Sequence, residues 1–303
     1  MTDKKKILVV GGNGFLGRNI LDKAKQLDWE TTNLSLSDDS YKKSDYFIKS
    51  DISNFKNLNE DLSGISFDYV VNCGGYVNHD SFYKSGIKIL NTHFIGVVNL
   101  IRAIDKRKLV KFINIGSGDE YGLQKSPTTE KKRENPNTIY SFSKAAASQF
   151  LQMIHVSENM PTTTLRVFLV YGPGQSNNRF IPQVISGCLE DKNFPTSLGD
   201  QIRDFLYIDD FVDAVFLTLD CKEAEGKVFN IGSGKQYKIK DVISLIQKKI
   251  GLGKPSFGEV PYKDNENMSL YPDISKIKKT LHWDPKTSLE HGLLKTIESY
   301  SGK

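Results

Sequence analysis

The chain has 303 residues, of which 38% are hydrophobic and 25% charged, and its net charge is +5. This length allows one large domain or two unequal ones, and the composition is that of a globular protein rather than a nucleic-acid-binding one. No apolar run approaches the roughly 20 residues of a membrane span. The three cysteines and five histidines show no metal-ligand spacing. We therefore expect a cytoplasmic protein with reduced thiols and without metal, nucleic-acid or membrane partners.

The first apolar run is followed by a glycine-rich turn. Ile7 to Val10 are all apolar, as in a buried parallel strand, and a helical pattern extends from the turn to about Leu27. Glycines in such a turn let the backbone approach a pyrophosphate, which the helix N-terminus attracts. The alternative is a plain strand-to-helix turn. The cofactor-binding residues predicted here are Gly11, Asn13, Gly14, Phe15, Leu16 and Gly17.

Strand patterns then alternate with helical ones. Strands are expected near 31–34, 46–48, 69–72 and 111–115, and a further helix at 180–189. This alternation predicts an α/β fold, a Rossmann-type doubly wound parallel sheet with a smaller C-terminal substrate-binding domain. We expect residues 1–168 to form the dinucleotide-binding domain, with segments near 203–232 added to its sheet. Residues 169–303 would be mainly substrate-binding.

The end of the second strand bears on the choice of dinucleotide. An NAD site usually has Asp or Glu here to hold the ribose 2′-hydroxyl, whereas the segment 32–37 contains no acid. Ser35, together with Ser37 and Lys42 or Lys43, can instead receive a 2′-phosphate. We therefore favour NADP(H), and NAD(H) is the alternative if Asp38 or Asp39 takes the place of the acid.

A carboxylate follows the third strand. Asp51 either accepts a hydrogen bond from the adenine amine or caps the N-terminus of the helix that begins near Ser53. Both interpretations stay open.

Tyr140 and Lys144 lie four positions apart, and Ser117 precedes them. On a helix, residues i and i+4 share one face. We expect the ammonium to lower the pKa of the phenol, so that Tyr140 can exchange a proton with a sugar oxygen near neutral pH. Taken singly, the three could be an ordinary half-buried tyrosine, a solvated lysine and a turn serine.

With these motifs in order, the chain resembles the extended short-chain dehydrogenase/reductase family, in its nucleotide-sugar epimerase, dehydratase and reductase branch. The resemblance extends over nearly the whole chain. Its motifs are GGNGFLG at 11–17, Asp51-Ile52, NCGG at 72–75, Asn91-Thr92 with Gly96, Ser117 before Tyr121-Gly122, YSFSK at 140–144, Arg166 before YGPGQ at 171–175, RDF at 203–205 with Asp209-Asp210, NIGSG at 230–234, and Trp283-Asp284-Pro285.

The resemblance implies roles for the matched positions. Tyr140 would be the general acid/base, Lys144 would lower its pKa and bind the nicotinamide ribose, and Ser117 would contact the reacting oxygen. Arg203, with Arg179 as a second candidate, would bind the diphosphate of a nucleotide-diphospho-sugar, unless Arg203 only pairs with Asp204 or Asp209. Besides the glycine turn, the cofactor would contact Ser35, Asp51, Ile52, Cys73, Gly74, Asn91, Tyr140 and Lys144. Relatives form homodimers through the Tyr140 helix and a helix at about 87–104, so we expect a homodimer.

Departures from the family pattern reduce the number of reactions that the chain could catalyse. Dehydratases of this branch carry an acid where this chain has Gly118, which weakens a 4,6-dehydratase assignment. The neighbouring Asp119 could act as a base, contact the substrate or brace the loop. We expect an NADPH-dependent 4-ketoreductase of a nucleotide-linked deoxyhexose, with the keto oxygen between Ser117 and Tyr140. The alternatives are an NAD-dependent 4-epimerase and, because some proteins of this fold only sense dinucleotides, a non-catalytic binder.

Overall fold

The computed structural model describes residues 4–262 and 266–301. Its centre is a seven-stranded sheet in which every neighbouring pair is parallel. The strands in spatial order are β11 (Val228–Ile231), β6 (Thr162–Val167), β5 (Lys111–Ser117), β4 (Tyr69–Asn72), β1 (Lys6–Val10), β2 (Glu30–Ser35) and β3 (Tyr46–Lys49). The chain therefore reverses its direction of winding beside β1, where ligands bind in open α/β sheets.

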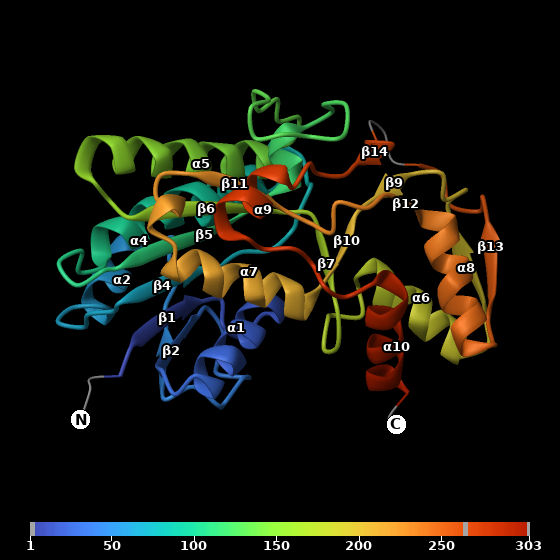
Figure 1. Cartoon of the computed structure of the whole chain (residues 1–303), viewed down its shortest axis with the longest axis horizontal. Coiled ribbons are helices and arrows are strands. Elements are labelled where there is room, and N and C mark those ends of the chain that lie inside the picture. Colours follow the sequence, from blue (N-terminus) through green and yellow to red (C-terminus); the bar gives the residue numbers. More distant parts are fainter. Residues whose placement is uncertain (1–3, 263–265, 302–303) are drawn as a thin grey trace.

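Helices cover both faces of this sheet (Figure 1). The helices α1 (Phe15–Gln26) and α7 (Ile208–Asp220) pack on one face, and α2 (Phe55–Asp61), α4 (Gly96–Ala103) and α5 (Ile139–Glu158) pack on the other. Alternate residues of β1 pack into two hydrophobic cores on opposite faces of the sheet. Ile7 and Val9 belong to one core, and Leu8 and Val10 belong to the other. Burial on both faces explains why this strand is a continuous apolar run.

The predicted fold class is confirmed, and so are the strands expected near 31–34, 46–48, 69–72 and 111–115. The helix expected at 180–189 is α6 (Phe180–Leu189). Residues 228–231 add the last strand of the main sheet. The division of the chain at residue 168 stays a prediction.

Most of the rest of the C-terminal half lies at one end of the molecule (Figure 1). The helices α6, α8 (Ile239–Ile250) and α10 (Leu289–Tyr300) pack together there. Three small sheets pair β7 (Leu169–Tyr171) with β10 (Phe205–Tyr207), β8 (Asn193–Thr196) with β13 (Lys254–Phe257), and β9 (Ile202–Arg203) with both β12 (Tyr237–Lys238) and β14 (Ser269–Leu270). The helix α9 (Ser275–Leu281) packs against β11 and α7, and two short helices are η3 (Gly118–Tyr121) and η4 (Lys222–Ala224). No helix in the described ranges is long and apolar enough to span a membrane.

The single helix expected at about 87–104 is interrupted. It consists of α3 (Ile87–Leu90), the π-helical turn η2 (Asn91–Ile95) and α4, and another π turn, η1 (Phe82–Gly86), precedes it. A π turn widens the helix locally and changes which side chains face a neighbour. His93, in η2, is buried against the ring of Tyr140 at a centroid distance of 5.0 Å.

The Asp45 carboxylate connects the loop before β3 with the start of β2 through hydrogen bonds. Asp45 accepts hydrogen bonds from the Thr31 amide (2.9 Å), the Thr31 hydroxyl (2.8 Å) and Lys25 Nζ (2.7 Å). Burial alone would raise the pKa of Asp45, but these hydrogen bonds outweigh it and lower the pKa to about 2. Because the folded-state pKa lies below the unfolded one, near 3.9, the stabilisation is present above that pH and is lost as the pH falls toward about 2.

We predict that Asp45→Asn lowers the free energy of unfolding by about 1 kcal/mol at neutral pH, because the charge-assisted hydrogen bonds weaken. The difference from the parent should shrink at about pH 3, where the parent carboxylate begins to protonate. Urea denaturation at the two pH values measures this. Asp284→Asn is the matched control, because its carboxylate is 67% exposed and forms a surface ion pair with Lys278 at 2.8 Å. A difference that stays constant with pH would contradict the assignment.

Candidate active site

The glycine turn connects β1 to α1. Gly11 has a φ of +76°, and a Cβ at Gly17 would lie 2.4 Å from the Gly11 carbonyl oxygen, so glycine is required at both positions. The Gly14 amide donates to this same oxygen at 2.9 Å, and Gly14 is the N-cap of α1. The turn thus holds the helix N-terminus close to the strand. The first amides of a helix lack intrahelical partners, so the turn fits the pyrophosphate of a dinucleotide.

Asn13 connects the glycine turn to the end of β2. Its amide donates to the Ser35 hydroxyl at 3.3 Å, and its Nδ2 donates to the Ser37 hydroxyl at 3.3 Å and the Asp38 carbonyl at 2.9 Å. Ser35 in turn donates to Asn33 at 2.9 Å. The serine at the strand end is therefore part of the turn's own hydrogen-bond network.

The two acids that could replace the expected carboxylate have other partners. Asp38 is 91% exposed and pairs with Lys49 at 2.7 Å. Asp39 accepts from the amides of Tyr41 and Lys42 at 3.1 and 3.0 Å, which fixes the loop between β2 and β3. Neither interaction directs a carboxylate to a ribose.

The residues expected at other strand ends have clear local roles. Asp51 accepts from the Ser53 amide at 2.9 Å, but it does not cap the next helix: the N-cap of α2 is Asn54, which accepts from the Asn57 amide at 3.3 Å. The N-cap interpretation of Asp51 is therefore wrong, because the helix begins two residues later than expected. Its contact with adenine stays a prediction.

Cys73 and Gly74 follow β4 and lie against the glycine turn. The Gly74 amide donates to Asn72 at 3.0 Å. Burial raises the pKa of Cys73 to about 12, so its thiol is not a nucleophile at neutral pH. Ile52 is buried in the core below α4, and Asn91 lies in the π turn η2.

Tyr140, Lys144 and Ser117 meet at the junction of β5 and α5. The Thr138 hydroxyl caps α5 by accepting from the Ser141 amide at 3.1 Å, which places Tyr140 in the first turn. Ser117 ends β5, and its hydroxyl lies near enough to the Tyr140 phenol to lower the pKa of that phenol. Lys144 is buried, and its Nζ donates to the Ile115 carbonyl at 2.7 Å. The three residues thus lie around one junction, with the Lys144 ammonium directed to β5, and their catalytic roles stay predictions.

The expected effect of Lys144 on the phenol is not found. Burial raises the pKa of Tyr140 and the Asp119 carboxylate adds to the rise, while Ser117 and the Arg179 guanidinium oppose it. Burial also lowers the pKa of Lys144, although Glu120 opposes this. Position i+4 places the ammonium on the correct helix face but says nothing of burial, which dominates the pKa of the phenol here, and the lowering of that pKa by Lys144 stays a prediction.

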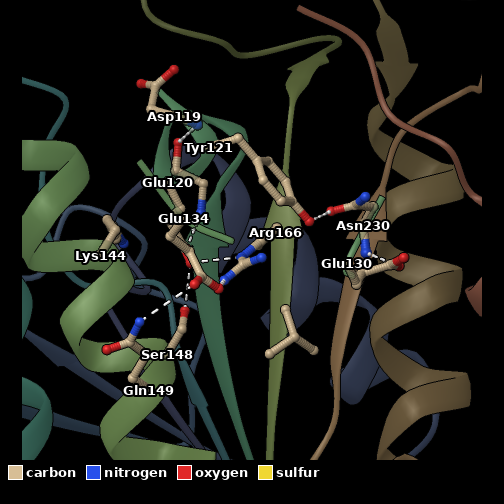
Figure 2. A network of polar contacts seen from close by, with 12 residues as sticks. Asp119, Glu120, Tyr121, Glu130, Glu134, Lys144, Ser148, Gln149, Arg166 and Asn230 are labelled. Atoms are coloured by element: carbon tan, nitrogen blue, oxygen red, sulfur yellow. Dashed lines mark hydrogen bonds and ion pairs between the residues drawn. The ribbon is translucent and has the colours of Figure 1, made fainter. Parts of the chain in front are cut away.

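A buried ion-pair network lies behind this junction (Figure 2). Glu120 is fully buried and accepts from Arg166 Nε at 2.6 Å, the Ser148 hydroxyl at 2.8 Å and the Ser117 amide at 2.9 Å. Arg166 also pairs with Glu134 and lies 4.7 Å over the Tyr121 ring. Through the hydrogen bond from the Ser117 amide to Glu120, the network holds the Ser117 backbone in place.

Asp119 lies beside Glu120 in the chain but has a different environment. Its carboxylate is turned away from the buried network (Figure 2) and approaches His79 Nε2 at 3.9 Å. His79 also meets the Tyr140 ring edge-on at 5.4 Å. Burial raises the pKa of Asp119, although the charges of His79 and Arg203 oppose the rise.

Arg203 has an ion-pair partner that the sequence did not indicate. It bonds Glu266 at 2.5 Å, and neither of the two acids considered as its partner is involved. Asp204 instead accepts from the amides of Ser233 and Lys235 at 2.7 and 3.1 Å, and Asp209 lies 3.9 Å from Lys295. Arg179 is exposed at the N-terminus of α6, near enough to influence Tyr140. Diphosphate binding by either arginine stays a prediction.

Sequence reasoning missed four residues of this site, namely His79, His93, Glu120 and Glu266. His79 and Glu266 lie in loops, His93 in the π turn η2 and Glu120 in the short helix η3, and segments of these kinds carry no periodicity that marks an inward face. In the described part of the chain, no three His, Cys, Asp or Glu side chains cluster as metal ligands do.

Comparison with known proteins agrees with this geometry. Residues 7–232 match the model of the NAD-dependent epimerase/dehydratase family. A dTDP-D-glucose 4,6-dehydratase from Bos taurus is 30% identical over 322 residues, which cover 98% of this chain and 88% of that protein.

Two solved structures are similar over 98% of this chain and 99% of their own. The UDP-glucuronic acid 4-epimerase from Bacillus cereus, in complex with UDP-glucuronic acid and NAD, has a TM-score of 0.86 at 26% identity. The UDP-glucose 4-epimerase from Thermotoga maritima, with UDP-glucose, has a TM-score of 0.88 at 25% identity. From its matched family model, its sheet and its glycine turn, we conclude that the chain belongs to the NAD-dependent epimerase/dehydratase family, whose members described above act on nucleotide sugars.

Proposed function

We propose that the protein transfers a hydride at C4 of a nucleotide-diphospho-sugar and acts as a 4-epimerase. The observation that carries this proposal is the meeting of Tyr140 with Ser117 at the carboxyl end of β5, at the same sheet edge as the glycine turn. Two hydroxyls there can hold one sugar oxygen and exchange its proton. When bound, the dinucleotide supplies the hydride acceptor and donor. The epimerase relatives, solved with UDP-sugars, support the substrate class.

A 4-ketoreductase is the second candidate. Ser35 stands where NAD-binding strands usually end in an acid, and the nearby acids have other partners, which favours NADP(H), the dinucleotide of reductive steps. A 4,6-dehydratase has less support, because a Cβ at Gly118 would lie 2.8 Å from the Phe168 ring. A side chain at position 118 would require the Phe168 ring to move.

One assay separates the two candidates. We expect the purified protein to interconvert UDP-glucose or UDP-glucuronic acid with their C4 epimers without added dinucleotide, as followed by NMR. If it instead consumes NADPH in step with a UDP- or dTDP-linked 4-keto-6-deoxy sugar and leaves the UDP-sugars unchanged, it is a reductase. Failure of both assays would contradict hydride transfer at C4.

We predict that Tyr140→Phe lowers turnover by about 10²- to 10⁴-fold, because the acid/base group is removed. The affinity for the dinucleotide, measured by calorimetry, should change little. Tyr300→Phe, which removes a phenol on α10, is the matched control and should keep its turnover. A non-catalytic dinucleotide sensor would show no turnover before or after the change.

We predict that Ser35→Asp weakens NADP binding relative to NAD by tenfold or more, since a carboxylate at the end of β2 repels a 2′-phosphate and can hold a 2′-hydroxyl. Calorimetric titration of parent and variant with both dinucleotides measures this ratio. Ser35→Ala controls for the lost hydroxyl. An unchanged ratio would mean that the ribose lies elsewhere.

We further infer a homodimer through α5 and α3. The exposed face of α5 presents Phe142, Met153 and Val156, which are 50%, 52% and 83% exposed, and Tyr83 and Ile87 extend the apolar surface next to it. Val156→Glu should shift the protein toward monomer in light scattering, because it would bury a charge in the interface. Leu252→Glu, at an exposed leucine after α8, should not. A parent that is monomeric at micromolar concentration would contradict this inference.

A further inference from the structure

We propose that Arg18 selects the dinucleotide, by binding the 2′-phosphate that NADP carries on its adenosine ribose and that NAD lacks. This role rests on the dinucleotide binding that the proposed function requires. It adds a cationic group on α1 to the serine hydroxyls at the end of β2.

The guanidinium of Arg18 has donors without acceptors. Arg18 is the fourth residue of α1 and is half-buried. Its Nη2 donates to the Asn13 carbonyl oxygen at 2.7 Å. Its Nε is buried and has no hydrogen-bond partner in the described part of the chain. A guanidinium carries five N–H donors, and buried donors that stay unpaired cost stability, so this side chain suits a site that an anionic ligand completes.

Asn13 connects Arg18 to the end of β2. The Asn13 carbonyl accepts from Arg18, its amide donates to the Ser35 hydroxyl at 3.3 Å, and its Nδ2 donates to the Ser37 hydroxyl at 3.3 Å. A single residue therefore holds the guanidinium next to two serines. In this fold the adenosine ribose binds at the end of the second strand. A phosphate on the ribose 2′-oxygen would then meet the guanidinium and the serine hydroxyls together.

The face of α1 that carries Arg18 favours the 2′-phosphate over the pyrophosphate. The free amides at the start of the helix attract the pyrophosphate, whereas the Arg18 amide already donates to the Gly14 carbonyl at 3.0 Å. Residues i and i+4 share a helix face, and Asp22 accepts at 3.0 Å from the hydroxyl of Tyr41, in the loop between β2 and β3. Arg18 therefore lies on the face of α1 that is turned toward this loop, on the ribose side of the glycine turn.

The other charged groups around this loop are paired with one another. Lys43 lies 3.6 Å from Asp22, and Lys49 lies 2.7 Å from Asp38. These lysines offset the two acids, so that the acids repel a 2′-phosphate less. In the described ranges, neither acid forms an ion pair with Arg18. The planar guanidinium also presents paired donors that match a phosphate, which a lysine ammonium does not.

The test is calorimetric titration of the full-length protein, freed of any co-purified dinucleotide, with NADP and with NAD. We expect the parent to bind NADP more tightly. Arg18→Gln should weaken NADP binding by about tenfold or more and change NAD binding by less than about twofold, because only NADP makes the lost contact. Arg18→Lys keeps the charge without the paired donors and should give an intermediate loss. Arg102→Gln is the matched control and should bind both dinucleotides like the parent, because this exposed arginine of α4 lies over the Phe55 ring at 3.7 Å, across the sheet from α1.

Equal losses of NADP and NAD affinity in Arg18→Gln would mean that Arg18 only holds the glycine turn through Asn13, and the proposal would fail. A parent that prefers NAD would overturn it as well. Turnover of nucleotide sugars is measured separately. If the parent epimerises or reduces them while Arg18→Gln leaves the ratio of NADP to NAD affinity unchanged, hydride transfer stands and the role of Arg18 is wrong. If Arg18→Gln abolishes the preference for NADP but the parent converts no nucleotide sugar, Arg18 binds the 2′-phosphate and the proposed function is wrong.

Discussion

The active-site geometry depends on the buried ion pair between Glu120 and Arg166. Removing two charges from water costs several kcal/mol per ion, so such a pair persists only when the remaining donors and acceptors are satisfied. Here Glu120 receives three hydrogen bonds, one of them from the Ser117 amide at 2.9 Å. Breaking the pair would leave an uncompensated charge under β5. The position of the Ser117 hydroxyl is thus determined by an interaction that no substrate touches.

The same carboxylate acts on Lys144. Burial favours the neutral amine, and the charge of Glu120 favours the ammonium. The Ile115 carbonyl, on the same strand as Ser117, accepts from Lys144 at 2.7 Å and fixes its position. One buried network of two glutamates and an arginine therefore holds the serine and supports the charge of the lysine.

The sequence predicted what is local in the chain. The glycine turn, the Tyr140–Lys144 spacing and the strands are read from neighbouring residues, and the structure has them. Contacts that join distant segments could not be predicted in this way. Glu266 reaches Arg203 across 63 positions and His79 reaches Asp119 across 40, and neither pair has a periodic signal. The rise of the Tyr140 pKa on burial could not be predicted for the same reason, because burial is a property of the whole fold.

The raised pKa of Tyr140 affects the direction in which this residue transfers a proton. A phenol whose pKa is raised by burial and by Asp119 holds its proton, so the protein alone favours donation to a forming alkoxide. Abstraction from an alcohol requires the phenolate, which a nearby positive charge stabilises. The oxidised dinucleotide carries such a charge on its nicotinamide ring and the reduced one does not. The protonation state of Tyr140 would then follow the redox state of the bound dinucleotide, with a base present when the sugar is to be oxidised and an acid when it is to be reduced.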